Sequence, residues 1–185
     1  MHKKGEIYVK KRLSNFFATV LFTLLLLMLM GCTEEREAKK QDKNIQIIEA
    51  VLQNSLTGPS DELKQIVDQE SEEKLATLRQ YEDKLFKDYF ANETSYIEFV
   101  NTYGSTILIE AIKNDYNFQI KNIDYEKVEE KDSMYNFSVE LQLQKDTESS
   151  KYEIVTGQAN LNEDHKIETI LIRIEDLYKS MINER

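Results

Sequence analysis

One stretch of this chain, residues 135–144, constrains the fold more than any other, because apolar and polar side chains alternate along it without interruption. Successive side chains of a β-strand point to opposite faces, so this period of two predicts a long strand with one buried face. The apolar positions are Tyr135, Phe137, Val139, Leu141 and Leu143. Such a strand needs neighbouring strands for its backbone and a second layer of elements over its apolar face.

Three other segments are predicted to join this strand in a sheet. Residues 116–125 also alternate, but they change phase near Lys121, which predicts a β-bulge. Residues 151–161 give another strand, and a polar turn at residues 162–165 leads to a last one at residues 167–174. Short connections join antiparallel neighbours, so the pattern predicts a four-stranded antiparallel sheet.

The first half of the chain has a different period. Apolar residues recur there every three or four positions, which is typical of amphipathic helices that turn one face to a core. The expected helices cover residues 45–56, 61–67, 71–90 and 96–114, and a short one at residues 175–184 closes the chain. Gly104 costs about 1 kcal/mol relative to Ala inside a helix, so we expect a kink or a close backbone contact there. The order predicts an α+β domain with N-terminal helices packed on a bulged antiparallel sheet.

The N-terminus has the parts of an export signal. A basic stretch at residues 3–12 precedes an uncharged apolar run at residues 13–30. The tetrapeptide that ends this segment is Leu29-Met30-Gly31-Cys32. It resembles the lipobox of bacterial lipoproteins, which implies cleavage after Gly31 and acylation of Cys32. The alternative is an uncleaved membrane helix, because an apolar run of about 18 residues approaches the length that spans a bilayer. Both interpretations place the rest of the chain outside the cell.

Residues 1–31 are thus the predicted signal, residues 32–44 a flexible tether and residues 45–185 a single domain. The tether has no apolar residue beyond Ala38 and mixes both charges. Cys32 is the only cysteine of the chain, and two acyl chains on it would hold the protein stably, since one chain binds a membrane only marginally. We therefore expect a lipid-anchored protein on the extracytoplasmic face of the cell membrane.

Charge narrows the range of partners. The chain has 34 acidic and 24 basic residues and a formal net charge of -10. The predicted signal contains five of the basic residues and one acidic residue, so its removal leaves a more acidic protein. This balance argues against binding to nucleic acid and to anionic lipid, because both attract basic proteins. The acidic residues Glu129, Glu130 and Asp132 lack the spacing of a calcium loop, so we expect neither a metal site nor a cofactor.

Three stretches carry a resemblance to a known fold. They are VLQNSLTGP at residues 51–59, KDYF at residues 87–90 and GQANLN at residues 157–162. Together with the order of helices and strands, they resemble small lipoproteins of Gram-positive bacteria with a nuclear-transport-factor-2-like domain. This resemblance implies a cone-shaped fold, and enzymes of that superfamily place an Asp or a His beside a Tyr inside the cone. Fold alone does not fix function, so the individual residues decide.

Aromatic residues supply the candidates for a pocket. These candidates are Tyr89, Tyr96, Phe99 and Tyr103, with the acid Asp124. They are expected to line the mouth of a cone, although aromatic residues at helical spacing are also typical of a core. Glu110 is a second acid with apolar sequence neighbours, and His165 is interpreted as a solvated turn residue.

The sequence contains no catalytic motif, so the leading hypothesis is a non-enzymatic binding or interaction domain with a protein or peptide partner at the cell surface. The alternative is a small enzyme or a carrier of apolar ligands, with an aromatic cone-shaped pocket and Asp124 or Glu110 as its acid. Geometry distinguishes the two hypotheses. An enclosed cavity with an ionisable group beside a tyrosine favours the alternative, and a filled core favours the binding domain.

Overall fold

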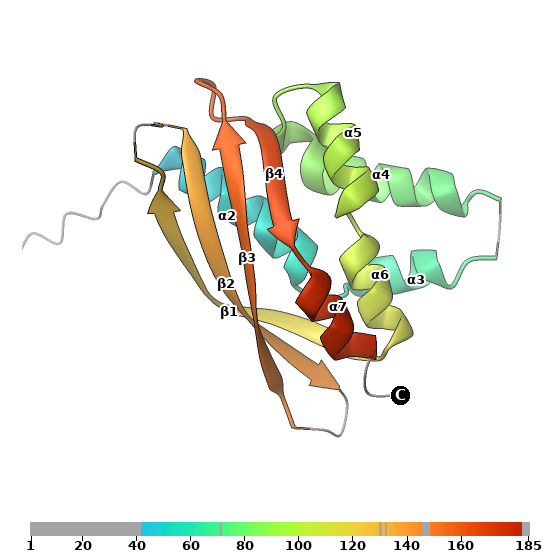
Figure 1. Ribbon diagram of the computed structural model, residues 1–185. Helices are drawn as coiled ribbons and strands as arrows, with labels where there is room; N and C mark the ends of the chain where they lie inside the picture. Colours follow the sequence, from blue (N-terminus) through green and yellow to red (C-terminus); the bar gives the residue numbers. More distant parts are fainter. Residues whose placement is uncertain (1–41, 71, 130, 132, 146–148, 183–185) are drawn as a thin grey trace, which may run out of the picture. The chain divides into compact units, whose positions relative to one another are not determined.

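The structure, a computed structural model, describes residues 42–182 except 71, 130, 132 and 146–148 (Figure 1). Helices come first, a four-stranded antiparallel sheet follows, and a short helix closes the chain, which confirms the predicted α+β class. The elements are α2 (Lys43–Leu56), α3 (Asp61–Val67), α4 (Lys74–Phe86), the 3-10 helix η1 (Lys87–Tyr89), α5 (Glu93–Thr102), α6 (Thr106–Lys113), β1 (Tyr116–Lys127), β2 (Met134–Lys145), β3 (Lys151–Leu161), β4 (Ile167–Arg173) and α7 (Glu175–Ile182).

The sheet has the strand order β1-β2-β3-β4, and each strand pairs antiparallel with the next one along the chain. The predicted bulge is present: the register between β1 and β2 shifts between Ile120 and Asn122, so Lys121 has no residue opposite it. A second shift, at Asn160 and Leu161 opposite β4, was not predicted. Both shifts bend the ladder locally and increase its twist.

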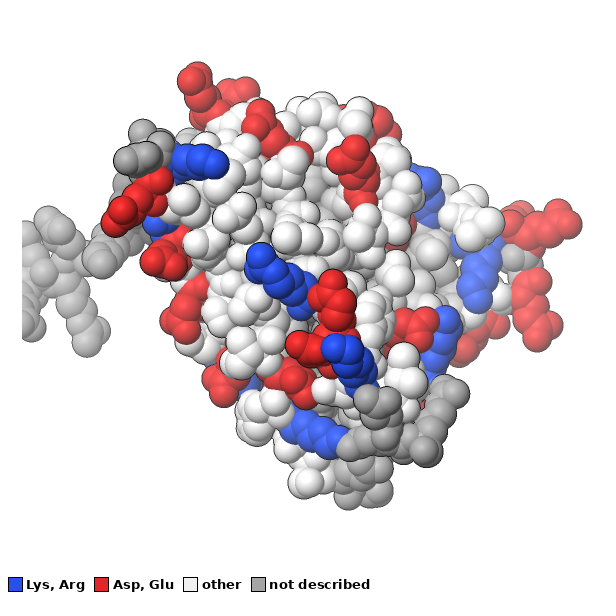
Figure 2. All heavy atoms as spheres, viewed as in Figure 1, with Lys and Arg blue, Asp and Glu red and all other residues white. Residues whose placement is uncertain are grey.

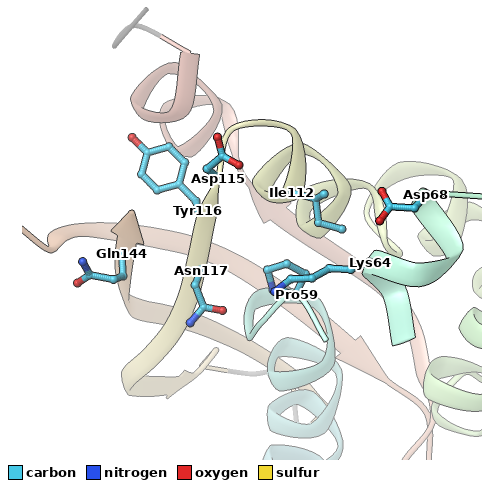
Figure 3. A pocket seen from close by; sticks show the side chains of 8 residues that line it. All are labelled: Pro59, Lys64, Asp68, Ile112, Asp115, Tyr116, Asn117 and Gln144. Carbon is cyan, nitrogen blue, oxygen red and sulfur yellow. The ribbon is translucent and has the colours of Figure 1, made fainter. Parts of the chain in front are cut away.

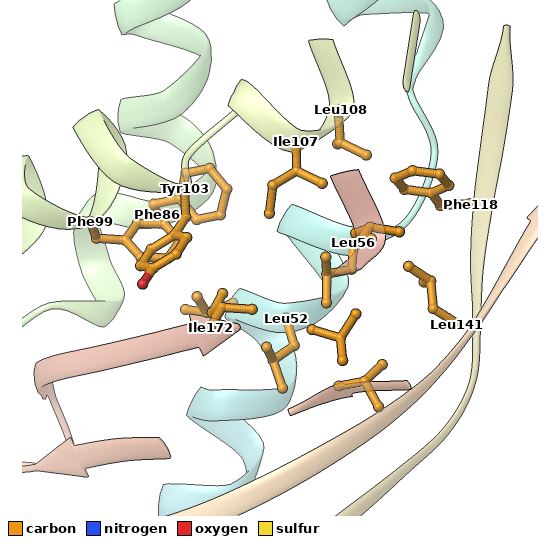
Figure 4. Close-up of a cluster of buried hydrophobic side chains, with 14 of the residues drawn as sticks. Leu52, Leu56, Phe86, Phe99, Tyr103, Ile107, Leu108, Phe118, Leu141 and Ile172 are labelled. Carbon is orange, nitrogen blue, oxygen red and sulfur yellow. The ribbon is translucent and has the colours of Figure 1, made fainter. Parts of the chain in front are cut away.

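One face of the sheet and the helices above it enclose the core (Figure 4). Every second residue of β2 is buried there, as the period of two predicts. From α2, the side chains of Ile48, Val51 and Leu56 have no exposed surface at all. Burial of one such side chain contributes roughly 1.5–3 kcal/mol, so the packing of α2 on the sheet is a major source of stability.

The helix expected at residues 96–114 is two helices, α5 and α6, and the prediction of one continuous helix was wrong. Gly104 lies in the turn between them, where a Cβ atom would be 2.6 Å from the Val100 carbonyl oxygen and 2.8 Å from Glu82 Oε1. The expected close contact at this glycine is therefore confirmed. The same Glu82 carboxylate accepts a hydrogen bond from the Ser105 N–H at 3.1 Å, and so satisfies a backbone group at the start of α6.

The first helix begins earlier than expected. Asp42 is the N-cap of α2, because its carboxylate accepts a hydrogen bond from the Asn44 N–H at 2.9 Å. Asn44, which the prediction assigned to the tether, is only 8% exposed. The compact unit that contains the sheet accordingly starts at Asp42 instead of residue 45. Residues 1–41, with Gly31 and Cys32, lie outside the described residues.

Candidate functional site

A depression of about 550 Å³ opens between α3, the end of α6 and the first residues of β1 (Figure 3). This volume falls within the range of about 300–1,000 Å³ that is typical of small-ligand pockets, and the depression is open to solvent. The residues that line it are Pro59, Lys64, Asp68, Ile112, Asp115, Tyr116, Asn117 and Gln144. We call it the polar groove, because most of these side chains are polar or charged.

Local contacts fix the connection between α2 and α3 that forms one wall of the polar groove. Gly58 has a φ of 114°, which residues with a side chain rarely adopt, and it forms a backbone bridge to Phe118 of β1. Ser60 then caps α3, accepting a hydrogen bond from the Leu63 N–H at 3.2 Å. Pro59 and the start of α3 are thereby held beside β1.

The opposite wall is the turn from α6 into β1. The Asn114 side chain donates a hydrogen bond to the Glu110 carbonyl at 2.8 Å and closes the last turn of α6. Asp115 follows in the left-handed region, with a φ of 59°, a conformation that Asp and Asn tolerate better than most residues. This turn sends Tyr116 into the core while Asp115 stays exposed at the edge of the polar groove.

Charges of both signs face the polar groove. Lys64 and Asp68 are four residues apart at α3, so they lie on the same side of it, and Asp115 comes from the opposite wall. The Lys64 ammonium is 3.9 Å from the Asp61 carboxylate, a weak and solvent-exposed pairing. Ile112 lies between the two walls and adds an apolar surface (Figure 3). A polar ligand with a cationic group for the aspartates and an acceptor for Lys64 fits this arrangement.

The aromatic candidates lie in the core. Tyr96, Phe99 and Tyr103 are 1%, 3% and 7% exposed, respectively. Phe99 is central to the group and lies beside Phe86 (Figure 4), with a distance of 5.1 Å between the two ring centroids. Its ring centroid is 4.8 Å from that of Phe90. These distances are those of packed aromatic pairs. The structure therefore uses these side chains mainly to join α4 and α5 to the sheet.

The other candidates do not gather around this aromatic group. Tyr89 is half-buried at the end of η1. Asp124 is exposed on β1 and accepts a hydrogen bond from the Asn122 side chain at 3.0 Å. Glu110 forms an ion pair with Lys113 at 2.6 Å on the surface of α6. Neither of the two proposed acids is thus brought together with the proposed aromatic residues.

Two acids of α4 that the sequence analysis did not single out form buried or partly buried hydrogen bonds to the next two helices. The Tyr96 hydroxyl donates to Asp83 Oδ1 at 2.5 Å, and burial together with this bond raises the pKa of Tyr96. Glu82 is 7% exposed, and burial raises the pKa of its carboxyl, although the hydrogen bond from Ser105 acts in the opposite direction. Both carboxylates connect α4 to α5 and α6, so we assign them a structural role.

His165 is not the solvated turn residue that the sequence suggested. It has a φ of 61°, it is half-buried, and its Nδ1 lies 2.7 Å from the Asn44 side-chain oxygen. The Asn44 amide group donates in turn to the Tyr135 hydroxyl at 3.5 Å, and that hydroxyl donates to Asp42. Because the amide oxygen of Asn44 only accepts, Nδ1 of His165 is the donor in either charge state of the ring. We call these four residues the Asn44 network.

No protein-family model matches the chain, and a search of the curated proteins finds no match either. Within the part of the chain that the structure describes, no helix is both long and apolar enough to cross a membrane. The fold and the polar groove thus define a small α+β domain with an open polar depression on its surface.

Proposed function

We propose that this protein is a lipid-anchored binding protein on the extracytoplasmic face of the cell membrane, and that its domain binds a polar ligand or a protein partner in the polar groove without catalysing a reaction. One observation carries the proposal. Aromatic side chains fill the interior, whereas the open groove with its charged walls is available to a ligand. A filled core favours a binding domain over an enzyme or carrier with an internal pocket.

The alternative, an enzyme or apolar-ligand carrier with an aromatic cone, has less support. It needs an acid and a tyrosine that face the same enclosed cavity. Tyr96 does meet an acid, Asp83, but that contact is a hydrogen bond that joins α4 to α5. Asp124, the acid expected from the sequence, is exposed on β1. The resemblance to nuclear-transport-factor-2-like lipoproteins remains a prediction, and the proposal does not depend on it.

The charges of the polar groove suggest the class of ligand. A cationic group would approach Asp68 and Asp115, and a carboxylate or carbonyl of the same ligand would approach Lys64. The groove is open to solvent, so it suits one end of a longer molecule better than a ligand enclosed on all sides. A peptide or another zwitterionic group exposed at the cell surface has this chemistry.

The anchor is supported by the sequence at residues 29–32 and is tested by mass spectrometry of the protein purified from membranes. We expect the wild-type chain to begin at Cys32 and to carry acyl chains on it. The variant Cys32→Ala should retain residues 1–31 and carry none, while the neighbouring control Thr33→Ala should be processed normally. An unmodified Cys32 peptide from native membranes would contradict the proposal.

Binding is tested with a photo-crosslinking amino acid at Asn117 in the polar groove of the full chain, expressed in its host. Gln65, which is exposed on α3 but does not line the groove, is the control position. We expect a discrete crosslinked species from position 117 and none from position 65. Lys64→Glu should reduce its yield at least tenfold, whereas Lys84→Glu on α4 should not. Equal crosslinking from both positions, or an insensitive yield, would exclude the groove as the binding site.

A further inference from the structure

The chain enters the described domain at a corner that hydrogen bonds hold in place. Asp42 caps α2, and its carboxylate accepts a hydrogen bond from the Tyr135 hydroxyl at the start of β2. Asn44 is bonded to His165 in the turn between β3 and β4. The Asn44 network therefore marks the end of the domain to which the predicted tether, and with it the proposed anchor on Cys32, is attached.

The polar groove lies at the other end of α2. A helix rises about 1.5 Å per residue, so the 14 residues of α2 span about 21 Å. Pro59, which lines the groove, follows the last residue of α2 by three positions. In Figure 1, α2 runs from the beginning of the described chain toward α3, which forms one wall of the groove. The groove is thus separated from Asp42 by the length of this helix.

The sheet gives the same separation independently. Tyr135 of the Asn44 network and Gln144 of the polar groove both belong to β2, nine residues apart. A strand rises about 3.3 Å per residue, so these two positions are separated by up to about 30 Å. The register places Lys127 of β1 opposite Tyr135 and Asn117, another groove residue, opposite Gln144. Both strands therefore run from the Asn44 network at one end to the polar groove at the other.

Charge opposes any arrangement that would bring the polar groove to the membrane. On the face that Figure 2 shows, acidic side chains of the described residues are widespread, and basic ones are scattered among them. Asp68 and Asp115 also face the groove itself. Anionic lipid repels such a surface over about 10 Å at physiological salt. The groove could reach the lipid only if the domain turned over and pressed this acidic surface against it.

The ligand chemistry of the polar groove has two possible sources. Lys64, Asp68 and Asp115 suit a ligand that has an ammonium group close to an oxygen acceptor. The headgroup of phosphatidylethanolamine has this chemistry, and so does the amino end of a peptide. The distance from the attachment point distinguishes the two sources, because headgroups stay in the plane of the membrane whereas a peptide can extend beyond it.

We propose that the polar groove binds the free amino end of a peptide displayed away from the membrane surface, and that lipid headgroups are not its ligand. This inference rests on the proposed function, because it requires both the anchor and the groove. The ammonium group of the peptide approaches Asp68 and Asp115, and its first carbonyl accepts a hydrogen bond from Lys64. α2 and the sheet act as a spacer between the attachment point and the binding site.

The test uses the full chain purified from membranes and reconstituted in vesicles of phosphatidylethanolamine and phosphatidylglycerol. A photo-crosslinking amino acid is placed at Asn117 in the groove or at Glu163, which is exposed two residues before His165 and marks the attachment end. The added probe is the peptide Leu-Gly-Gly-Lys with a free amino end and biotin on its lysine. Mass spectrometry identifies the adducts. We expect peptide adducts from position 117 and lipid adducts from position 163, with at least tenfold fewer lipid adducts from position 117.

Two changes test the role of the amino end. N-acetylation of the probe removes its cation and should lower the yield of peptide adducts at position 117 at least tenfold. Asp115→Asn removes one of the carboxylates that the cation approaches and should also lower this yield. Asparagine tolerates the left-handed conformation of residue 115, so the turn is preserved. Asp164→Asn, at an exposed acid near the attachment end, is the matched control and should change the yield less than twofold. Circular dichroism verifies that the variants are folded.

Three results would overturn this inference and leave the proposed function intact. Lipid adducts as abundant from position 117 as from position 163 would show that the groove reaches the membrane. Peptide adducts that acetylation does not reduce would exclude the amino end as the ligand. Crosslinking of position 117 to a partner in the host but not to the probe peptide would indicate a ligand of another class. If position 117 gave no crosslinked species in the host either, the proposed function itself would be refuted.

Discussion

Glu82 and Gly104 meet where α5 ends, and each explains the presence of the other. The glycine leaves room for a carboxylate oxygen that would be 2.8 Å from any Cβ atom at that position. The carboxylate then accepts the Ser105 N–H, which would otherwise be a buried donor without a partner at the start of α6. The buried carboxylate of Glu82 and the glycine at position 104 thus together stabilise the turn between α5 and α6.

Glu82→Gln should stabilise the protein at neutral pH. Burial raises the pKa of the Glu82 carboxyl above its usual 4.5, so ionisation is more costly in the folded state than in the unfolded state. The stability linked to its proton is fully present below pH 4.5 and is lost as pH rises through the folded pKa. A glutamine keeps an acceptor for Ser105 and carries no charge. In urea titrations, its advantage over wild type should be largest at pH 7 and vanish below pH 4.5.

The matched variant Glu82→Leu separates charge from hydrogen bonding. It removes the same charge but leaves the Ser105 N–H without an acceptor, which costs about 1–3 kcal/mol. We expect it to be less stable than Glu82→Gln at every pH. If both variants were equally stable, the Glu82 carboxylate would have no role at the start of α6.

Gly104→Ala should lower the free energy of unfolding by about 1–3 kcal/mol, because the new methyl group overlaps the Val100 carbonyl and the Glu82 carboxylate. The φ of Gly104 is not among the positive values, so space and not backbone strain is the cause. Alanine at Asn101, an exposed position of α5, is the control and should change stability by less than about 0.5 kcal/mol. Thermal melts that do not distinguish the two variants would contradict this account.

At the scale of whole elements, α2 is the segment that joins most parts of the domain. It packs on the sheet with fully buried side chains, and its first turn is held by its own N-cap and by the Asn44 network. The residues that hold the first turn of α2, Asp42 and Asn44, are polar. The sequence analysis therefore assigned them to the tether. The start of α2 therefore contributes to folding even though it contains few apolar residues.

A chain that begins at Asn44 should be less stable than one that begins at Lys40. The shorter chain lacks Asp42, so it loses the N-cap of α2 and the acceptor of the Tyr135 hydroxyl. Loss of an N-cap costs about 0.5–2 kcal/mol. Urea unfolding of both chains measures the difference, and Asp42→Asn in the longer chain is the control, because asparagine also caps helices. If the two chains were equally stable, residues 40–43 would not belong to the folded domain, in agreement with the boundary predicted from the sequence.

The elements were predictable wherever their signal is local. The expected strand at residues 151–161 coincides with β3, since a period of two is visible in the strand itself. The break between α5 and α6 depends on Glu82, which is 23 residues from its partner Ser105. The bond between Asn44 and His165 spans 121 residues. The polar groove likewise combines residues of separate elements, so only the folded chain reveals it.

For the molecule as a whole, charge and the proposed anchor have opposite effects at a membrane. The acidic domain is repelled by anionic lipid, whereas acyl chains on Cys32 would hold it there regardless of charge. Attachment to the membrane would then depend on the modified residue alone. The domain would be free to present the polar groove to partners.

A chain of residues 40–185 should therefore remain in solution when mixed with phosphatidylglycerol vesicles, at low and at high salt. The full chain purified from membranes should sediment with the same vesicles, because its acyl chains insert into them. Sedimentation followed by gel electrophoresis measures both fractions. Salt-sensitive sedimentation of the shorter chain would indicate a basic lipid-binding surface and would contradict the charge argument.

The Asn44 network also has a mechanical consequence. It fastens the first residues of the domain to the start of β2 and to the turn between β3 and β4. A force applied to the chain on the N-terminal side of Asp42, such as tension in a membrane tether, would act first on the Asn44 network. The hydrogen bonds of this network must break before α2 can unfold from its N-terminus. The domain therefore resists mechanical unfolding at the residues where the force is applied.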